Sequence, residues 1–241
     1  MVGDLNPKQL TGLDDTHLVP LSGGHRLQSD VARAYAALAA DAREAGFDLA
    51  VASAYRSFSR QLVIWNGKAR GERAVHDDQG RSVPMSELSP ALQLRAILRY
   101  SAIPGTSRHH WGTDLDVYDA AAVPPDYELQ LSVAEVAPGG MFDALHSWLD
   151  AHMAEGRSHG FYRPYDEDRA GVAPERWHLS YAPLSVKCAA QINEELLAAC
   201  WDCAEVAEAM LLREEIERNW SEIMARFVAV PQDWCPRQSW S

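Results

Sequence analysis

The 241-residue sequence has no excess of positive charge, no long apolar run and no recognisable export segment. Its 34 acidic residues against 22 basic ones give a net charge of −12, which argues against nucleic acid as the main partner. No segment approaches the ~18 consecutive apolar residues of a transmembrane helix. Residues 1–8 lack the basic stretch followed by an apolar one that marks a secretory signal. We therefore expect a cytoplasmic protein without a nucleic-acid or membrane partner.

Cysteine is scarce and confined to the last quarter of the chain, at Cys188, Cys200, Cys203 and Cys235. Cys200 and Cys203 form a C-x-x-C pair, but no second pair or histidine cluster accompanies it. Disulfides are rare in a reducing compartment. We therefore interpret the four cysteines as free thiols rather than as a structural metal site or a redox site.

Internal repeats, low-complexity tracts and linkers between domains are also absent. The hydrophobic content of 47% and the charged content of 23% are ordinary for a globular chain, and a chain of this size can form a core without disulfides. The pattern favours one domain over residues 1–184 and a helical extension over residues 185–241 that packs on it. The amphipathic extension is expected to cover that domain or to form a homodimer, and a partner-binding module is less favoured.

Apolar periodicity and chain breakers predict a mixture of helices and short strands. Helices are predicted over residues 29–46, around 61–65, and over 89–100, 141–155 and 184–228. Strands are predicted over residues 48–53, 112–118, 160–162 and 176–181. The remaining long segments, residues 1–28, 66–88 and 119–140, are predicted to be irregular. Asp114 and Asp116 lie two residues apart on one predicted strand, so their side chains are expected to point the same way.

Three segments carry side chains suited to metal chemistry: 53–57 (Ser-Ala-Tyr-Arg-Ser), 107–116 (Ser-Arg-His-His-Trp-Gly-Thr-Asp-Leu-Asp) and 175–178 (Glu-Arg-Trp-His). The second and third together supply two imidazoles and one carboxylate. Such a set leaves one tetrahedral position of Zn²⁺ open for water, as in a catalytic zinc site. Glu175 is then free to take a proton from that water, and Arg56 can face negative charge on a substrate. The residues alone leave open whether His109 or His110 is the ligand.

In these segments the chain resembles the zinc D,D-carboxypeptidases and D,D-dipeptidases related to VanY and VanX, the LAS group of peptidoglycan peptidases. The resemblance covers about residues 25–185. The family pattern S-x-H-x-x-G-x-A-x-D is matched by Ser107, His109, Gly112 and Asp116. The later E-x-W-H pattern is matched by Glu175, Trp177 and His178, and the earlier Y-R-S element by Tyr55, Arg56 and Ser57.

The resemblance implies that His109, Asp116 and His178 bind zinc, and its seven-residue spacing selects His109 over His110. It implies that Glu175 is the catalytic base and that Arg56 stabilises the oxyanion. One departure is Asp114, which stands where the family has a small residue. Its carboxylate would either crowd the metal or hold a ligand histidine from outside.

The resemblance also implies an α+β fold of the Hedgehog and D,D-peptidase type, with a small, largely antiparallel sheet flanked by helices. Asp116 and His178 should lie on neighbouring strands. Ser107 and Gln61 are implied as substrate-binding residues, although each could equally cap a helix or a turn. Trp177 and Tyr181 are expected to shape the pocket wall, although aromatic residues in strands are more often part of the core.

The function implied is a zinc carboxypeptidase that removes a terminal D-alanine from peptidoglycan stem peptides. The expected cytoplasmic location favours an L,D-carboxypeptidase that acts on recycled tetrapeptide. The alternatives are a D,D-carboxypeptidase or D,D-dipeptidase, a peptidoglycan endopeptidase, and a zinc-stabilised binding domain of the Hedgehog type. We expect Arg56, or an arginine of the basic segment 66–73, to bind the free carboxylate of the substrate.

Overall fold

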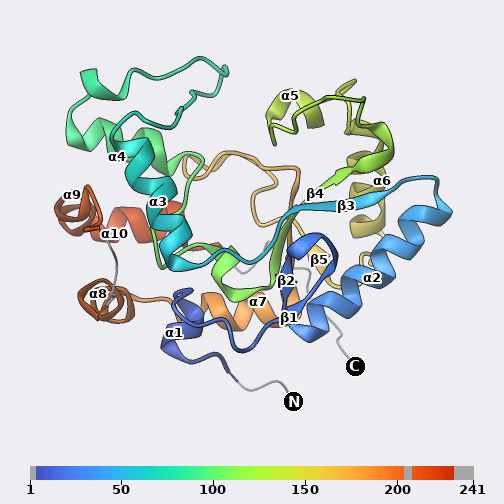
Figure 1. The fold of residues 1–241 in the computed structure, drawn as a ribbon, viewed down its shortest axis with the longest axis horizontal. Helices are drawn as coiled ribbons and strands as arrows, with labels where there is room; N and C mark the ends of the chain where they lie inside the picture. The colour runs from blue at the N-terminus through green and yellow to red at the C-terminus, as the bar shows by residue number, and fades with distance from the viewer. Residues whose placement is uncertain (1–3, 204–207, 231–241) are drawn as a thin grey trace.

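The computed structural model describes residues 4–203 and 208–230 (Figure 1). The helices are α1 (Pro7–Leu10), α2 (Ser29–Glu44), α3 (Phe58–Ala69), α4 (Pro90–Leu98), α5 (Val133–Val136), α6 (Asp143–Ala154), α7 (Ala182–Ala189), α8 (Glu194–Cys203), α9 (Arg213–Arg218) and α10 (Trp220–Ile223). The strands are β1 (Val19–Pro20), β2 (Arg26–Leu27), β3 (Leu49–Ser53), β4 (Asp114–Asp119), β5 (Phe161–Tyr162) and β6 (His178–Tyr181). None of the described helices has the length and hydrophobicity needed to cross a bilayer.

The centre of the fold is an antiparallel sheet in the order β3-β4-β6-β5. Side chains alternate between the two faces of a strand. Leu115 and Val117 of β4 and Leu179 of β6 are fully buried against α2 and α6, which cover one face. The alternate residues of β4 and β6 therefore face the other side of the sheet, where a cavity lies. The prediction of an α+β fold with a small antiparallel sheet is confirmed.

Two helices flank the cavity, α3, which begins before the predicted segment 61–65, and α4, which begins where its sequence predicts. The hydroxyl of Ser57 accepts a hydrogen bond of 3.2 Å from the Arg60 amide and caps α3. Pro90 occupies the first turn of α4, where its missing N–H costs no helical hydrogen bond. Both helices lie on the side of the molecule opposite α2 (Figure 1).

The C-terminal helices pack against α3 and α4. Ile216 of α9 and Ile223 of α10 are buried in one cluster with Trp65 and Ile97. The Trp65 indole also donates a hydrogen bond of 2.9 Å to the carbonyl of Leu211. This packing agrees with an extension that covers the domain, while the boundary at residue 184 and the homodimer stay predictions.

Four predicted segments differ from the structure. Residues 1–28, predicted to be irregular, contain the strands β1 and β2 and the helix α1, which an Asn6–Gln9 capping box stabilises. Residues 66–69 continue α3 instead of starting a loop, because the polar side chains there do not interrupt helical hydrogen bonding. The predicted loop over 119–140 contains α5, which a Ser132–Glu135 capping box stabilises. The predicted helix over 184–228 is divided into the separate helices α7 to α10.

The structure describes two of the four cysteine side chains. Cys188 and Cys200 are both buried. The side chains of Cys203 and Cys235 lie outside the described part, so the interpretation of the C-x-x-C pair stays a prediction.

Candidate active site

Two neighbouring strands bring Asp116 and His178 together. They face each other directly in the register of β4 and β6, with His178 Nδ1 3.3 Å from Asp116 Oδ1. His109 Nε2 approaches the same carboxylate from the other side, 3.4 Å from Oδ2. Donor atoms of these three buried residues all lie within 4.8 Å of one another. The structure thus gathers the three predicted zinc ligands into one cluster.

His109 is placed by a short 3-10 helix, η3 (Arg108–Trp111), just before β4. Gly112 ends this helix with a φ of +67°, and a Cβ there would lie 2.3 Å from Leu18 Cδ2. Glycine therefore allows the sharp change of direction that sets His109 beside Asp116. His109 Nδ1 lies 2.8 Å from the Ala54 carbonyl oxygen. Because a carbonyl only accepts, Nδ1 carries the proton and Nε2 keeps a free lone pair for a metal.

His178 is oriented in a similar way by Asp114. Its Nε2 lies 2.9 Å from Asp114 Oδ1, so the ring donates there and leaves Nδ1 toward Asp116. Arg108 donates to the same oxygen of Asp114 at 2.8 Å. Burial opposes ionisation of Asp114, but Arg108 and His178 hold the pKa of its carboxyl well below the usual range. Of the two alternatives for Asp114, the structure supports the one in which it holds a ligand histidine.

His110 is excluded as a ligand by its hydrogen bonds. Its Nδ1 lies 2.6 Å from the carbonyl oxygen of Arg56, and its Nε2 accepts from the Gly105 amide at 3.1 Å. Both ring nitrogens are therefore occupied by the backbone. Burial lowers the pKa of His110 to about 3, so the ring is neutral. This histidine joins the Arg56 and Gly105 segments instead of binding a metal.

The cluster fits a zinc ion. Asp116 Oδ1 is a buried carboxylate oxygen without a hydrogen-bond partner in the described structure. Such an oxygen is costly unless a ligand binds it. With one free lone pair on each ring, His109 and His178 complete a ligand set of two imidazoles and one carboxylate, which suits tetrahedral Zn²⁺ with an open position.

Glu175 lies beside the cluster without joining it. Its Oε2 is 3.5 Å from His178 Nδ1, and the side chain is 14% exposed toward the cavity. Burial, together with the negative charge of Asp116, raises the pKa of Glu175 to about 7 despite the nearby His178 and Arg56. A carboxylate with such a pKa can accept and return a proton near neutral pH.

Arg56 reaches the cavity from the end of β3. Its guanidinium donates to Gln61 Oε1 at 3.0 Å and to Ser53 Oγ at 3.2 Å. The Gln61 amide in turn donates 2.6 Å to the Ala102 carbonyl. Gln61 is fully buried and does not line the cavity. The structure therefore corrects the substrate-binding interpretation of Gln61: its side chain holds Arg56 in place.

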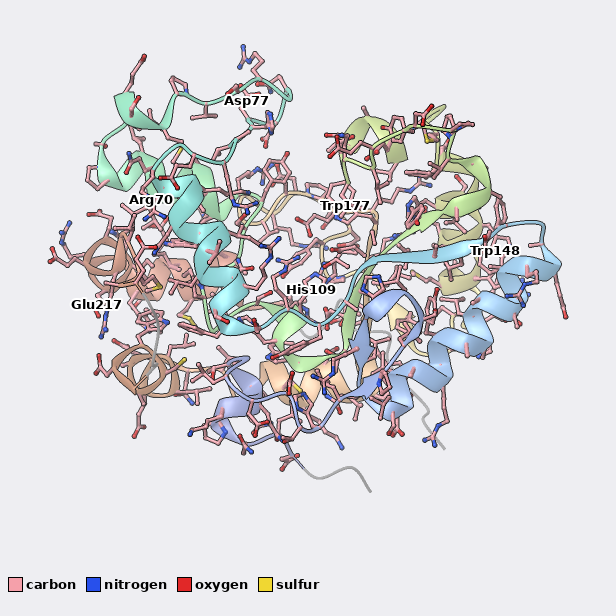
Figure 2. The ribbon with its side chains drawn as sticks, viewed as in Figure 1. Arg70, Asp77, His109, Trp148, Trp177 and Glu217 are labelled. Carbon is pink, nitrogen blue, oxygen red and sulfur yellow. The ribbon has the colours of Figure 1, made fainter. Side chains whose placement is uncertain are left out.

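The cluster lies at the base of a cavity of about 760 Å³. Ser107 and Trp177 line it as predicted, and Figure 2 shows Trp177 beyond His109 on the open side. Two further lining residues, Lys68 and Tyr165, were not predicted. Tyr165 packs edge-on against His178 with 5.2 Å between ring centroids. Tyr165 lies in a loop outside every motif, so nothing in the sequence indicated that it lines the cavity. For Lys68 one indication existed, its position two helical turns after Gln61 on the same helix face.

Tyr181 does not line the cavity. Its ring packs on Phe161, 5.5 Å between centroids, beside the core on the opposite face of the sheet. Alternation along β6 explains this position, because His178 and Ser180 take the cavity face and Leu179 and Tyr181 the core face. The expectation that Tyr181 shapes the pocket wall is therefore wrong.

Comparison with known proteins agrees with this architecture. Residues 24–184 match the family VanY, D-alanyl-D-alanine carboxypeptidase. An uncharacterized protein of Haemophilus influenzae is 44% identical over 103 residues, which cover 41% of this chain and 70% of the relative. A second uncharacterized protein of that organism is 34% identical over 123 residues, which cover 50% of this chain and 91% of the relative.

Two solved structures share the fold. VanYB in complex with D-alanine-D-alanine aligns with a TM-score of 0.50 and 22% identity, over 72% of this chain and 81% of VanYB. A variant of the vancomycin-resistance D,D-pentapeptidase VanY in complex with Zn(II) aligns with a TM-score of 0.50 and 24% identity, over 76% of this chain and 90% of that one.

The fold and the cluster define a metallopeptidase in which a small antiparallel sheet carries the metal ligands. The chain belongs to the VanY family of D-alanyl-D-alanine carboxypeptidases. The predictions of the family and of a metal-dependent enzyme are confirmed, and the non-enzymatic Hedgehog-type alternative is set aside.

Proposed function

We propose that this protein is a zinc carboxypeptidase that removes the terminal D-alanine from peptidoglycan stem tetrapeptides. The observation that carries the proposal is the position of Glu175, beside three convergent ligand atoms at the base of a cavity. A purely structural zinc site needs no such base. His109, Asp116 and His178 hold the metal, whose chemistry when bound is to acidify water and polarise the scissile carbonyl.

The residues around the cluster have different roles in the reaction. Glu175 accepts a proton as water attacks the carbonyl carbon, and then donates it to the amine nitrogen as the C–N bond breaks. Arg56 faces the oxyanion that develops on the carbonyl oxygen, in the position that Gln61 and Ser53 fix. Trp177 and Tyr165 supply aromatic walls to this region of the cavity. The proton released by water and the negative charge on the carbonyl oxygen are therefore each taken up by a residue that the fold positions.

The size of the cavity is compatible with the L,D bond. A D,D bond follows a D-alanine with a methyl side chain, whereas the last bond of a tetrapeptide follows a much longer side chain. A cavity of about 760 Å³ has room for that longer side chain. The D,D-carboxypeptidase and the endopeptidase are the alternatives that the experiment must separate.

The decisive experiment incubates the purified, zinc-loaded protein with tetrapeptide and pentapeptide muropeptides and detects the products by mass. Loss of a single alanine from the tetrapeptide is the expected result. Cleavage of the pentapeptide with an untouched tetrapeptide would establish the D,D alternative instead. Cleavage within a cross-linked dimer would establish an endopeptidase.

A cytoplasmic location belongs to the same proposal, because free tetrapeptide arises there when wall fragments are recycled. Fractionation of the native cells, with antibody detection of the protein, tests it. Recovery with the cell envelope would contradict the recycling role and leave the chemistry of the site unaffected.

A further inference from the structure

Lys68 is a cavity residue that the proposed chemistry does not use. It lies near the end of α3, is partly buried and lines the same cavity as Glu175. Its ammonium donates one hydrogen bond of 2.6 Å to Ser101 Oγ. Within the described residues it makes no ion pair, so two of its three donors remain available. It is also one of only three lysines in the sequence.

Two other basic residues near the cavity, in contrast, are paired with carboxylates. Arg70 pairs with Glu72 and Glu208, and Arg99 pairs with both Asp78 and Asp168. The expectation that an arginine of segment 66–73 enters the cavity is not met, because neither Arg70 nor Arg73 lines it. Figure 2 shows Arg70 well away from His109.

The cavity thus contains two cations without a carboxylate partner among the described residues, Arg56 and Lys68. Burial lowers the pKa of both, which makes an unpaired position costly for each. A peptide substrate presents two negative groups during the reaction, the transient oxyanion and the permanent terminal carboxylate. Arg56 lies next to the metal ligands and therefore suits the oxyanion. Lys68 is then the cation available for the terminal carboxylate.

Helix α3 carries both Lys68 and the residue that holds Arg56. Gln61, which holds Arg56, and Lys68 are seven residues apart and share one face of the helix. Two turns separate them by about 10 Å along the axis. Because helical side chains lean toward the N-terminus, the Lys68 side chain leaves α3 on the side of Gln61, and its ammonium is held by Ser101. The two cations line one cavity and lie close enough for the charge of Arg56 to add to burial in lowering the pKa of Lys68.

We propose that Lys68, positioned by Ser101, binds the free α-carboxylate of the substrate and so makes the enzyme a carboxypeptidase. This inference rests on the proposed peptidase function and assigns its end-group specificity. It replaces Arg56 and the arginines of segment 66–73 as the carboxylate-binding group.

The experiment is a double-mutant-type cycle in which one change is made in the protein and the other in the substrate. Free-acid and C-terminally amidated tetrapeptides are compared on wild type and Lys68→Gln, by kcat/KM and by calorimetric binding. Wild type should prefer the free acid, and Lys68→Gln should lower kcat/KM for it by about 10- to 100-fold, the size of a charge-assisted hydrogen bond. The amidated peptide should be nearly unaffected by the substitution, so the two changes are non-additive.

Two further variants separate recognition from folding. Lys68→Arg retains the positive charge and should retain most of the free-acid preference. Lys187→Gln, an exposed lysine on α7, should behave as wild type. Zinc content and melting temperature confirm that each variant is folded.

The possible outcomes distinguish the two proposals. If wild type cleaves neither peptide, the proposed function fails, and the binding cycle still decides the role of Lys68. If wild type cleaves the peptides but Lys68→Gln weakens free-acid and amidated peptides equally, the inference is overturned. Equal binding of both peptides by wild type would also overturn it.

Discussion

At the scale of single residues, Asp114 shows how a buried carboxylate can serve a metal without binding it. Its oxygens accept from His178, Arg108 and Thr113, and the side chain is completely buried. The ion pair with Arg108 compensates the cost of burying both charges. Asp114 therefore couples the orientation of His178 to the packing beneath the sheet.

Replacing Asp114 by Asn tests this coupling. The variant should bind zinc about 10- to 100-fold more weakly, because His178 loses its orienting carboxylate. It should also lose about 3–5 kcal/mol of stability, because Arg108 becomes a buried charge without a counter-ion. Zinc titration and denaturant unfolding measure the two effects. Asp168→Asn, which breaks an exposed pair with Arg99, is the matched control and should change neither quantity appreciably.

Glu175→Gln should separate proton transfer from metal binding. We expect a loss of turnover of about 10²–10⁴-fold, since the amide cannot accept a proton. Zinc content should stay equal to that of wild type, because Glu175 is not one of the three converging ligands. Metal analysis and single-turnover assays check both points, with the exposed Glu167→Gln as control. Loss of zinc in Glu175→Gln would make it a ligand.

The free-acid preference should depend on pH through Lys68. Burial lowers the pKa of Lys68 to about 8, and Glu175, Arg56 and Arg73 are the charged groups that act on it. Below that pH the ammonium is charged and binds a carboxylate, and above it the neutral amine binds poorly. The ratio of free-acid to amidated kcat/KM should therefore fall above about pH 8. The titration of groups that act equally on both peptides cancels in this ratio. A ratio that does not change with pH would therefore contradict the assignment of Lys68.

At the scale of elements, the C-terminal extension forms part of the cavity. Phe227 and Val228 of η5 (Met224–Val228) line it, although they lie beyond the segment 24–184 that matches the family. The extension is held there by Arg226, which donates 2.9 Å to the Ala170 carbonyl. Next to it, a Cβ on Gly171 would lie 1.8 Å from the Arg226 carbonyl oxygen. The close approach of two backbones explains why glycine stands at this position.

Gly171→Ala should therefore push η5 away from the cavity. Both clashing groups are backbone or Cβ atoms, so no side-chain rotation can relieve the contact, and a cost of about 1–3 kcal/mol is expected. KM for the peptide should change while zinc content stays normal. Arg226→Ala removes the hydrogen bond without a clash and should give a smaller effect in the same direction. A Gly171→Ala protein with wild-type KM would show that the extension takes no part in substrate binding.

At the scale of the whole molecule, the cavity lies between two groups of elements that come from distant parts of the chain. The segment around Asp77, next to α3 and α4, faces the segment around α5 across the open side (Figure 1 and Figure 2). Residues from both segments line the cavity, and the metal cluster lies below them on the sheet.

Metal binding should stabilise this arrangement as a whole. A ligand that binds only the folded state contributes about 4 kcal/mol at 1,000 times its Kd, which for a chain of this size raises Tm by on the order of 10 °C. Zinc added to chelator-treated protein should produce such a shift and restore turnover. His109→Ala should abolish most of the shift. An equal shift in that variant would place the stabilising metal elsewhere.

The sequence by itself determined the chemistry of the site and the type of fold. The residue types of a zinc peptidase occur in ordered motifs, and alternation along a predicted strand puts Asp114 and Asp116 on one face. These are local relations, which spacing and the periods of helices and strands express directly.

Only the tertiary structure decided which groups meet across the fold. The backbone contacts of His110, the pairing of Asp114 with Arg108 and His178, and the core position of Tyr181 depend on neighbours from other elements. Lys68 enters the cavity because α3 extends beyond the predicted helix, and Phe227 lines the same cavity although it lies more than a hundred residues after Lys68 in the chain. Packing sets these contacts, since each element buries its apolar face against whichever segment completes the core.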